Sequence, residues 1–354
     1  MAQTILYLTP EVTPDTDLAV RYNISWRKQL IKDLGLNVIH TSFPKQLITT
    51  EWIPLVHSLF HATHVIIRID GSGKGDYLTL LKLLHPSSKI IWEVHGTPEE
   101  NIKYKGDIPK KYYVLTFRRK ILSMLVTTCM YVTKELADFI RPRIYSKHHV
   151  VVPNFISLRS SEYNNNFPVM PTFLKRKITK KFVILWGGSA RYPWQAIDSM
   201  VHVAKYFIQK DPTILFIIVG RHSWFPIPQI KNILYIQKLP RSSYIALLCR
   251  ANICLALYHR PPHAPLYFFP MKLLDYMYHK RPVIASDFPA FRTIISNNNN
   301  GILVFNNIRQ IVQAILRLKK DSALRHHIGR AAYKTVVTRY TDDIVKNKYR
   351  DLLV

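Results

Sequence analysis

The sequence predicts an α/β protein made of two doubly wound domains. Short runs rich in β-branched and apolar residues alternate with longer segments that carry a helical pattern, and the alternation recurs in both halves of the 354-residue chain. The short runs show little polar alternation, which is typical of strands buried on both faces of a parallel sheet. At roughly 150 residues for each domain, the length also suits two domains.

The first half, residues 1–156, is expected to form the N-terminal domain. Its predicted strands are Thr4–Leu8, Asn37–Thr41, His64–Ile69, Lys89–Val94, Thr127–Val132 and His149–Val152. Its predicted helices are Asp17–Leu34, Tyr77–His85, Lys110–Leu125 and Lys134–Ile140.

The second half repeats this order and is expected to form a second domain over residues 182–340. Its predicted strands are Phe182–Trp186, Ile214–Val219, Ile233–Ile236, Ile253–Leu257, Val283–Ser286 and Ile302–Phe305. Its predicted helices are Trp194–Gln209, Ser242–Arg250, Met271–His279, Ile308–Leu318 and Ser322–Thr338. Residues 157–181 contain turn formers and no clear period, which favours a linker, and residues 341–354 are expected to hold a last helix, Asp343–Leu353.

The charge of the chain is strongly positive and unevenly spread. Lys and Arg total 50 against 22 Asp and Glu, a formal net charge of +28. Residues 1–102 hold 9 basic and 10 acidic side chains, whereas residues 103–354 hold 41 basic and 12 acidic ones. Such an excess attracts polyanions, among them phosphorylated substrates, anionic lipid and nucleic acid.

Composition excludes several classes of protein. Hydrophobic residues make up 48% of the chain, which excludes disorder over most of its length. No apolar run reaches the ~18 residues that span a bilayer, and residues 1–10 lack the pattern of a secretory signal. Three cysteines (Cys129, Cys249 and Cys254) make no disulfide framework, so we expect a reducing, cytoplasmic compartment.

The most informative segment runs from Pro270 to Asp287. A loop rich in proline and aromatic residues leads into a predicted helix, and Pro270 stands at its start, where a missing N–H costs nothing. Lys272 and the free N–H groups of the first turn would form a site for a diphosphate. Asp275 shares a helix face with Lys272 and would accept hydrogen bonds from two ribose hydroxyls. A capped helix with an i, i+3 ion pair explains the same residues without a ligand.

This segment resembles the donor-binding signature of glycosyltransferase family 4, retaining enzymes with the two-domain GT-B fold. Common variants of that signature read Pro-x-Lys-x-x-Glu-Tyr-Met and then Pro-Val-Ile-Ala-Ser-Asp, where this chain has PMKLLDYM and PVIASD. Three further segments agree in order and spacing: Trp92–Gly96, Val152–Asn154 and Trp186–Arg191. The resemblance spans about residues 60–340 and implies two Rossmann-like domains that face each other across a cleft. Residues 1–156 would bind the acceptor, residues 182–340 would bind the nucleotide-sugar, and the helix in residues 341–354 would cross back to the N-terminal domain.

The resemblance implies transfer of a hexosyl group from a nucleotide-sugar, a UDP- or GDP-sugar first of all, to a hydroxyl of a glycan or lipid-linked glycan. Arg191 and Lys272 would neutralise the donor diphosphate, His95 would face the sugar, and Asp275 matches the family's ribose-binding acid. No cofactor or metal is implied. The other positions implied to bind the nucleotide-sugar are Gly188, Ser189, Gln195, Arg221, Leu239, Pro240, Met271 and Leu273.

Two positions depart from the family pattern. Tyr267 stands where the first acid of a paired-acid motif is expected, and Gln195 is nearest to the place where many members carry lysine. The N-terminal glycine pair is also missing, because Leu8 is followed by Thr9-Pro10-Glu11-Val12. These departures favour an alternative, a weak or inactive transferase-like binding protein.

Two rivals belong to other classes. A basic nucleic-acid-binding protein on a GT-B scaffold has the charge in its favour, but we find no recognised motif and expect no specific nucleic acid. A nucleotide-sugar epimerase would share the fold, but its expected acid and histidine pairs are not apparent.

Two weaker patterns have ordinary explanations. Residues 71–76 (GSGKGD) resemble a phosphate loop but lack the Gly-Lys-Ser/Thr that such a loop requires, and a flexible turn is the simpler interpretation. His57, His61 and His64 are spaced for one helix face, but we expect His64 to open a strand, and no nearby carboxylate or cysteine completes a zinc shell.

The segment from Lys103 to Lys120 predicts a basic amphipathic surface helix. It carries seven basic side chains and one acid, with aromatic and aliphatic residues between them. We expect this helix to dock on anionic lipid, which would place the protein at the cytoplasmic face of a membrane; a solvated charged face is the alternative. The residues expected to dock are Lys110, Lys111, Arg118, Arg119 and Lys120.

Overall fold

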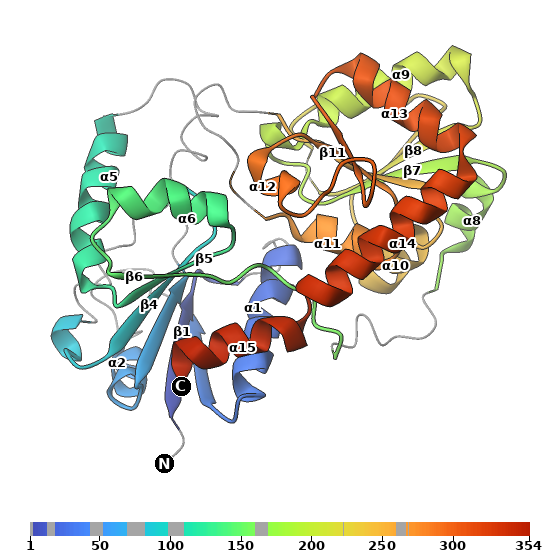
Figure 1. Cartoon of the computed structure of the whole chain (residues 1–354). Coiled ribbons are helices and arrows are strands. Elements are labelled where there is room, and N and C mark those ends of the chain that lie inside the picture. Colours follow the sequence, from blue (N-terminus) through green and yellow to red (C-terminus); the bar gives the residue numbers. More distant parts are fainter. Residues whose placement is uncertain are drawn as a thin grey trace. The chain divides into compact units, whose positions relative to one another are not determined.

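The computed structural model describes residues 3–12, 18–42, 52–68, 82–97, 110–159, 169–221, 223–259, 267 and 269–354. By their contacts these residues divide into two compact units. The N-terminal unit holds the described residues of Met1–Asn154, Pro261–Phe269 and Asp342–Val354. The C-terminal unit holds those of Phe155–Arg260 and Pro270–Thr341. Figure 1 shows that each unit is built on a sheet with helices packed against it.

The sheet of the N-terminal unit is six-stranded and parallel, in the order β2-β1-β3-β4-β5-β6. Its strands are β1 (Thr4–Thr9), β2 (Asn37–Ser42), β3 (His64–Arg68), β4 (Lys89–Val94), β5 (Thr128–Tyr131) and β6 (His148–Val151). Its helices are α1 (Leu18–Lys32), α2 (Trp52–Phe60), α5 (Lys110–Leu122), α6 (Lys134–Ile140) and α15 (Asp342–Leu353), with 3-10 turns η2 (Ser123–Leu125) and η3 (Arg141–Arg143). The strand order reverses between β1 and β3, so the loops that follow these strands diverge there.

The sheet of the C-terminal unit has the same plan, in the order β12-β11-β10-β7-β8-β9. Its strands are β7 (Phe182–Gly187), β8 (Ile214–Val219), β9 (Ile233–Ile236), β10 (Ile253–Ala256), β11 (Val283–Ser286) and β12 (Ile302–Val304). Its helices are α8 (Thr172–Ile178), α9 (Ile197–Lys210), α10 (Arg241–Leu248), α11 (Met271–Tyr278), α12 (Pro289–Arg292), α13 (Ile308–Lys320) and α14 (Ser322–Arg339), with a 3-10 turn η4 (Pro193–Gln195). The order reverses between β7 and β10, and ligands of such sheets bind beyond the carboxyl ends of the strands at this point.

Burial explains why the short apolar runs became strands. Every residue of β7, β8, β10 and β11 is buried, as expected for strands covered on both faces. The helix starts are capped in several places, because the side chains of Thr133, Asn307 and Asp321 accept hydrogen bonds from free N–H groups of α6, α13 and α14. The predicted α/β class with two parallel sheets is confirmed.

Most predicted elements are present, and four strands have the predicted bounds: Lys89–Val94, Ile214–Val219, Ile233–Ile236 and Val283–Ser286. Three helices were not predicted. Thr172–Ile178 lies where the sequence favoured a linker; it is only two turns long and buries one residue, Leu174, so no period can appear. Helix α2 is apolar on most sides, which hides its period, and α12 is a single turn. Of the predicted helix Tyr77–His85, residues 77–81 lie outside the described part, and residues 82–84 are helical.

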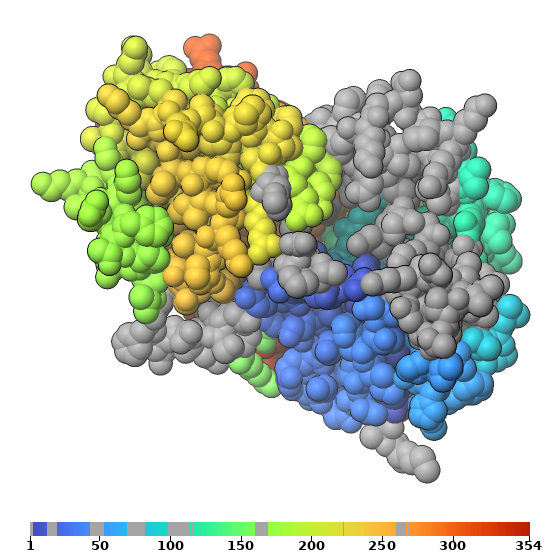
Figure 2. All heavy atoms as spheres, turned by 180° about the vertical axis from the view of Figure 1, so that it is seen from behind, coloured from blue at the N-terminus to red at the C-terminus, as the bar shows by residue number. Residues whose placement is uncertain are grey.

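Helices α8 and α10 lie next to each other at the surface of the C-terminal unit (Figure 2). Figure 2 shows α8, in green, beside α10, in yellow to orange, and Ser243 of α10 donates a hydrogen bond to Val169 O just before α8. Within the described residues, no helix combines the length and the apolar character that crossing a bilayer requires.

Candidate functional site

A glycine turn follows β7 at the switch point of the C-terminal sheet. A Cβ atom at Gly188 would lie 2.9 Å from Nζ of Lys272, and one at Gly187 would collide with the ring of Tyr244. A Cβ atom at Gly220 would collide with the carbonyl oxygen of Gly188. Glycine is therefore required here because neighbouring groups approach the turn closely.

Lys272 lies against this turn from the first turn of α11. Its ammonium donates a 2.7 Å hydrogen bond to Oε1 of Gln195 and sits 4.1 Å from the ring centroid of Trp186. Pro270 precedes α11 and no side chain caps the helix start. A helix N-terminus and an ammonium group beside an exposed glycine turn make an arrangement that attracts anions.

Not every implied residue of α11 faces this turn. The side chain of Leu273 is fully buried and its N–H is donated to the carbonyl of Pro270, so it serves the core. Met271 is half-buried at the first position of the helix. Asp275, one turn further along, receives two hydrogen bonds from Arg241, of 2.8 and 2.9 Å, in a partly buried bidentate ion pair.

Arg241 was not predicted as a site residue from the sequence, but its ion pair with Asp275 positions the loop that precedes α10. It is the first residue of α10 and directly follows Leu239 and Pro240, two of the implied nucleotide-binding residues. The pair with Asp275 therefore brings this loop to α11. The signal that could have found it is an arginine at a helix start directly after an implied binding loop.

The loop after the glycine turn is rich in aromatic rings. Tyr192 and Trp194 stack with their centroids 4.3 Å apart, and the guanidinium carbon of Arg191 lies 6.0 Å from the Tyr192 ring. The Ser189 hydroxyl is shielded from solvent and makes no hydrogen bond with the described part of the chain. Arg221, at the end of the loop after β8, is half-buried.

The implied first acid has no carboxylate counterpart in the structure. Tyr267 belongs to the N-terminal unit, where its carbonyl accepts a hydrogen bond from Thr133 and its ring packs 4.8 Å from that of Phe139. These contacts use the main-chain carbonyl and the aromatic ring of Tyr267, and neither group can replace a carboxylate.

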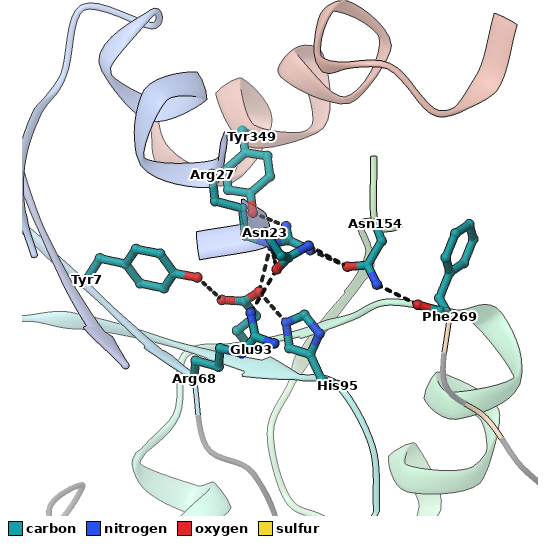
Figure 3. A network of polar contacts seen from close by, with 9 residues as sticks. All are labelled: Tyr7, Asn23, Arg27, Arg68, Glu93, His95, Asn154, Phe269 and Tyr349. Carbon is teal, nitrogen blue, oxygen red and sulfur yellow. Dashed lines mark hydrogen bonds and ion pairs between the residues drawn. The ribbon is translucent and has the colours of Figure 1, made fainter. Parts of the chain in front are cut away.

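The N-terminal unit contains a buried polar network centred on Glu93, the last but one residue of β4 (Figure 3). Tyr7 donates a 2.7 Å hydrogen bond to Oε2 of Glu93, and Nε of Arg27 lies 2.9 Å from Oε1. His95, just beyond β4, places Nε2 2.5 Å from the same Oε1. Glu93 is thus held by groups from α1, β1 and the loop after its own strand.

Further hydrogen bonds hold the residues that surround Glu93 in place. Arg27 also donates to Asn23, Asn154 and the hydroxyl of Tyr349 on α15. Arg68, at the end of β3, donates a 2.8 Å hydrogen bond to Asn23, and Asn154 donates one to the carbonyl of Phe269. The network therefore joins α1, β3, β4 and α15 with the chain segments at Asn154 and Phe269 (Figure 3).

Electrostatics set the protonation of this network. Burial acts to raise the pKa of Glu93, but Arg27, His95 and Arg68 outweigh burial and hold that pKa well below its ordinary value. Burial, assisted by the charge of Arg68, lowers the pKa of His95 to about 4. At neutral pH the carboxylate is therefore ionised and the imidazole is neutral.

Sequence reasoning chose His95 but gave no role to Glu93, Arg27, Asn23 or Arg68. The usable signal was an acid at position 93 inside an otherwise apolar strand, because a buried carboxylate demands a partner. The partner, Arg27, is 66 residues away and shows no local pattern.

The remaining sequence patterns have plain outcomes. His64 opens β3 as predicted, and the rings of His57 and His61 lie 4.9 Å apart at the end of α2. Among the residues that the structure describes, no group of three or more His, Cys, Asp or Glu side chains could hold a metal ion. The GSGKGD segment at 71–76 lies outside the described residues.

Helix α5 covers the second part of the predicted basic segment. The side chains of Lys110 and Lys111 lie outside the described part; Lys120 is exposed, with its ammonium 5.0 Å from the Tyr145 ring, and Arg118 is half-buried. Arg119 instead packs its guanidinium 5.0 Å from the ring of buried Trp92.

The comparison with protein families bears on the part of the chain that holds the glycine turn, Lys272 and Asp275. Residues 181–321 match the family described as Glycosyl transferases group 1. Over these residues the C-terminal unit is similar to that family. The match begins directly before β7 and ends after α13, so it includes every residue of the candidate anion site.

Comparison with individual proteins extends the sequence likeness beyond residues 181–321. A protein of Staphylococcus aureus (strain COL), named poly(ribitol-phosphate) alpha-N-acetylglucosaminyltransferase, is 24% identical over 79% of this chain. The match covers 54% of that protein, so this chain spans about half the length of the curated relative.

Solved structures share the fold. HepE of Anabaena, in complex with UDP and glucose, superposes with a TM-score of 0.73 at 13% identity and covers 99% of both chains. A glycosyltransferase of Rickettsia africae ESF-5 gives 0.73 at 17% identity, over 99% of this chain and 98% of its own. The predicted GT-B fold is confirmed.

Proposed function

We propose that this protein moves a hexosyl group from a UDP- or GDP-sugar to a hydroxyl of a glycan or lipid-linked glycan, with retention at the anomeric carbon. The observation that carries the proposal is the ammonium of Lys272 held beside the Gly188 turn at the start of α11. A structural neighbour is solved with UDP and glucose, and the curated relative is named for alpha-linked transfer.

Charge stabilisation would be the main catalytic contribution. In the reaction, the bond from the anomeric carbon to the diphosphate breaks, a bond to the acceptor oxygen forms on the same face, and the acceptor proton passes to a phosphate oxygen of the leaving group. Lys272, Arg191 and the N–H groups at Met271 would bind the charge that develops on the diphosphate. This mechanism needs no separate side-chain base.

Nucleotide binding would use the ion pair of Asp275 and Arg241. Arg241 fixes the carboxylate of Asp275 by a bidentate contact, and a carboxylate held in this way would accept a hydrogen bond from a ribose hydroxyl. The half-buried Arg221 and the loop of Leu239 and Pro240 would flank the nucleotide, and Ser189 and Gln195 would line the diphosphate. The N-terminal unit would bind the acceptor, with His95 facing the sugar.

The experiment measures release of nucleoside diphosphate from UDP- and GDP-hexoses, with and without glycan acceptors, and the anomeric configuration of the product by NMR. Retained configuration with acceptor-dependent release is expected. Inverted configuration would refute retention. Nucleotide binding without any turnover would support a binding protein instead, and salt-sensitive binding to duplex DNA without nucleotide binding would support the nucleic-acid hypothesis.

We further propose that the acceptor is reached at the cytoplasmic face of a membrane, through helix α5. Its large apolar side chains are exposed although water disfavours them: Tyr113, Val114, Phe117 and Ile121 are 66, 60, 68 and 45% exposed, and Met124 of η2 is 65% exposed. Most recur at helical spacing, so they share one face, and exposed Lys120 adds positive charge beside them.

Vesicle binding tests this surface. Replacing Phe117 and Met124 by Ser should release the protein from vesicles that contain anionic lipid, while Phe305→Ser, at a residue 63% exposed in the C-terminal unit, should leave binding intact. Replacing Lys110, Lys111 and Lys120 by Gln should weaken binding most at low salt. Unaltered sedimentation of both variants with vesicles would refute membrane docking.

A further inference from the structure

We propose that Glu93 is a positioning residue that holds neutral His95 with its proton on Nε2, so that Nδ1 faces the substrate as a hydrogen-bond acceptor. The inference rests on the proposed function, because it assumes that His95 contacts the sugar. It assigns to Glu93 a role through His95 rather than a contact with the substrate.

The geometry of the carboxylate dictates the tautomer. An ionised carboxylate accepts hydrogen bonds and donates none. Nε2 of His95 lies 2.5 Å from Oε1 of Glu93, and two lone pairs cannot face each other at that distance, so Nε2 must carry the proton. Burial separates the pair from water, which would otherwise compete for both groups.

The charges of Arg27 on α1 and Arg68 on β3 keep Glu93 ionised. Tyr7 on β1 donates its hydroxyl to Glu93, and Tyr349 on α15 accepts a hydrogen bond from Arg27. Burial raises the pKa of both phenols, so neither adds negative charge at neutral pH. Because two guanidinium groups lie near one carboxylate, the network already carries an excess of positive charge, which disfavours protonation of His95 to the imidazolium.

The surrounding bonds prevent Glu93 from turning away. Its second oxygen receives the hydroxyl of Tyr7, and Arg27 is itself fixed by Asn23 and Asn154. His95 cannot exchange its tautomer without breaking this arrangement. With the proton on Nε2, Nδ1 of the neutral ring carries a lone pair and would accept a hydroxyl hydrogen of the sugar.

The fixed tautomer of His95 affects which sugars the site would accept. A lone-pair nitrogen selects a sugar hydroxyl that donates, and it rejects an analogue in which the same oxygen is methylated or absent. A protonated or Nδ1-protonated ring would accept those analogues differently, because it would donate rather than accept.

The ring nitrogens of histidine report the tautomer directly in ¹⁵N NMR spectra of histidine-labelled protein. The His95 signals are identified by their absence from His95→Gln. In the wild-type protein at pH 7 we expect the Nε2-protonated form. A spectrum of an imidazolium or of the Nδ1-protonated form would overturn the proposal, and this measurement needs no variant of Glu93 to fold.

Glu93→Gln is the informative variant because an amide can donate as well as accept. We expect a mixture of tautomers and a fall in kcat of roughly 10- to 100-fold with little change in KM for the nucleotide-sugar, by loss of orientation alone. Tyr7→Phe is the matched control: it removes the hydrogen bond to Oε2 of Glu93, while Arg27 and His95 still hold Oε1, so the His95 tautomer should be unchanged. Glu93→Gln with an unchanged tautomer and unchanged kcat would overturn the proposal.

Failure of the two proposals is distinguishable. If the wild-type protein transfers no sugar, the proposed function falls, whereas the ¹⁵N spectrum still decides whether Glu93 sets the tautomer. If transfer occurs and the tautomer is the opposite one, the proposed function stands and the positioning role of Glu93 falls.

Discussion

Around Glu93 in the N-terminal unit, charged groups bind one another inside a strand-and-helix core, whereas Lys272 in the C-terminal unit lies beside a glycine turn and contacts an amide and two aromatic rings. Arg27, Arg68 and Glu93 are at most 5% exposed and share their hydrogen bonds inside the unit. Lys272 contacts the amide of Gln195 and the rings of Trp186 and Tyr258. A buried ion network fixes the geometry of its own groups, while a cation beside a glycine turn and a helix N-terminus adds to a positive potential that attracts an anion.

The difference predicts the largest effect for Lys272→Ala. Removing the ammonium should lower kcat on the order of 10²- to 10³-fold, because the charge on the leaving diphosphate loses its main partner. The kcat of Arg191→Ala should be lower than that of the wild type by about 10²-fold for the same reason. Steady-state kinetics with the best nucleotide-sugar measures both, and Lys205→Ala, an exposed lysine on α9, is the control. Equal kcat values for Lys272→Ala, Arg191→Ala and Lys205→Ala would show that neither Lys272 nor Arg191 stabilises the leaving diphosphate.

Lowering the pH should destabilise the N-terminal unit, because His95 is neutral in the folded chain. Because the pKa of His95 is lowered to about 4 in the folded chain and stays near 6.5 in the unfolded chain, the unfolded chain binds the proton first. The free energy of unfolding should therefore fall as the pH drops from 6.5 to 4, by up to roughly 3 kcal/mol. Urea unfolding at pH 7 and 4.5 measures this, and His95→Gln should flatten the slope. An unchanged slope would contradict a buried neutral imidazole.

Asp275→Ala should weaken binding of nucleoside diphosphates by about 10-fold, since hydrogen bonds to charged groups contribute roughly 1.5–3 kcal/mol. The variant also leaves Arg241 without its carboxylate, so Arg241→Gln is measured beside it to separate ribose binding from support of the loop. Calorimetry that gives equal affinities for Asp275→Ala and the wild type would exclude a ribose contact.

The smallest effect is expected for Gly188→Ala. The added methyl group would meet Nζ of Lys272 at 2.9 Å, where the flexible end of the lysine can move away, but the φ of Gly188, +155°, is one that L side chains rarely adopt. We expect a few-fold rise in KM for the nucleotide-sugar together with a lower melting temperature, because the ammonium is displaced and the backbone of the turn is strained. An unchanged KM and an unchanged melting temperature would show that the turn tolerates a side chain.

The sequence was informative where contacts are local. The strands of both sheets and the helix that begins at Met271 follow from apolar runs and from proline and glycine placement, and Lys272 lies within one turn of Pro270. Arg27 with Glu93, and Arg241 with Asp275, could not be predicted, because each pair joins elements that only the sheet topology brings together. Helix α8 was missed because seven residues with one buried side chain show no period.

Calorimetric titration with UDP and GDP tests the central claim most directly, on the wild-type protein and on Lys272→Ala. The account predicts that one nucleoside diphosphate binds the wild-type protein and binds Lys272→Ala at least about 10-fold more weakly, with a smaller gain in melting temperature. Equal affinity of both proteins, or no binding of either nucleotide to the wild type, would contradict a diphosphate site at Lys272 and the Gly188 turn.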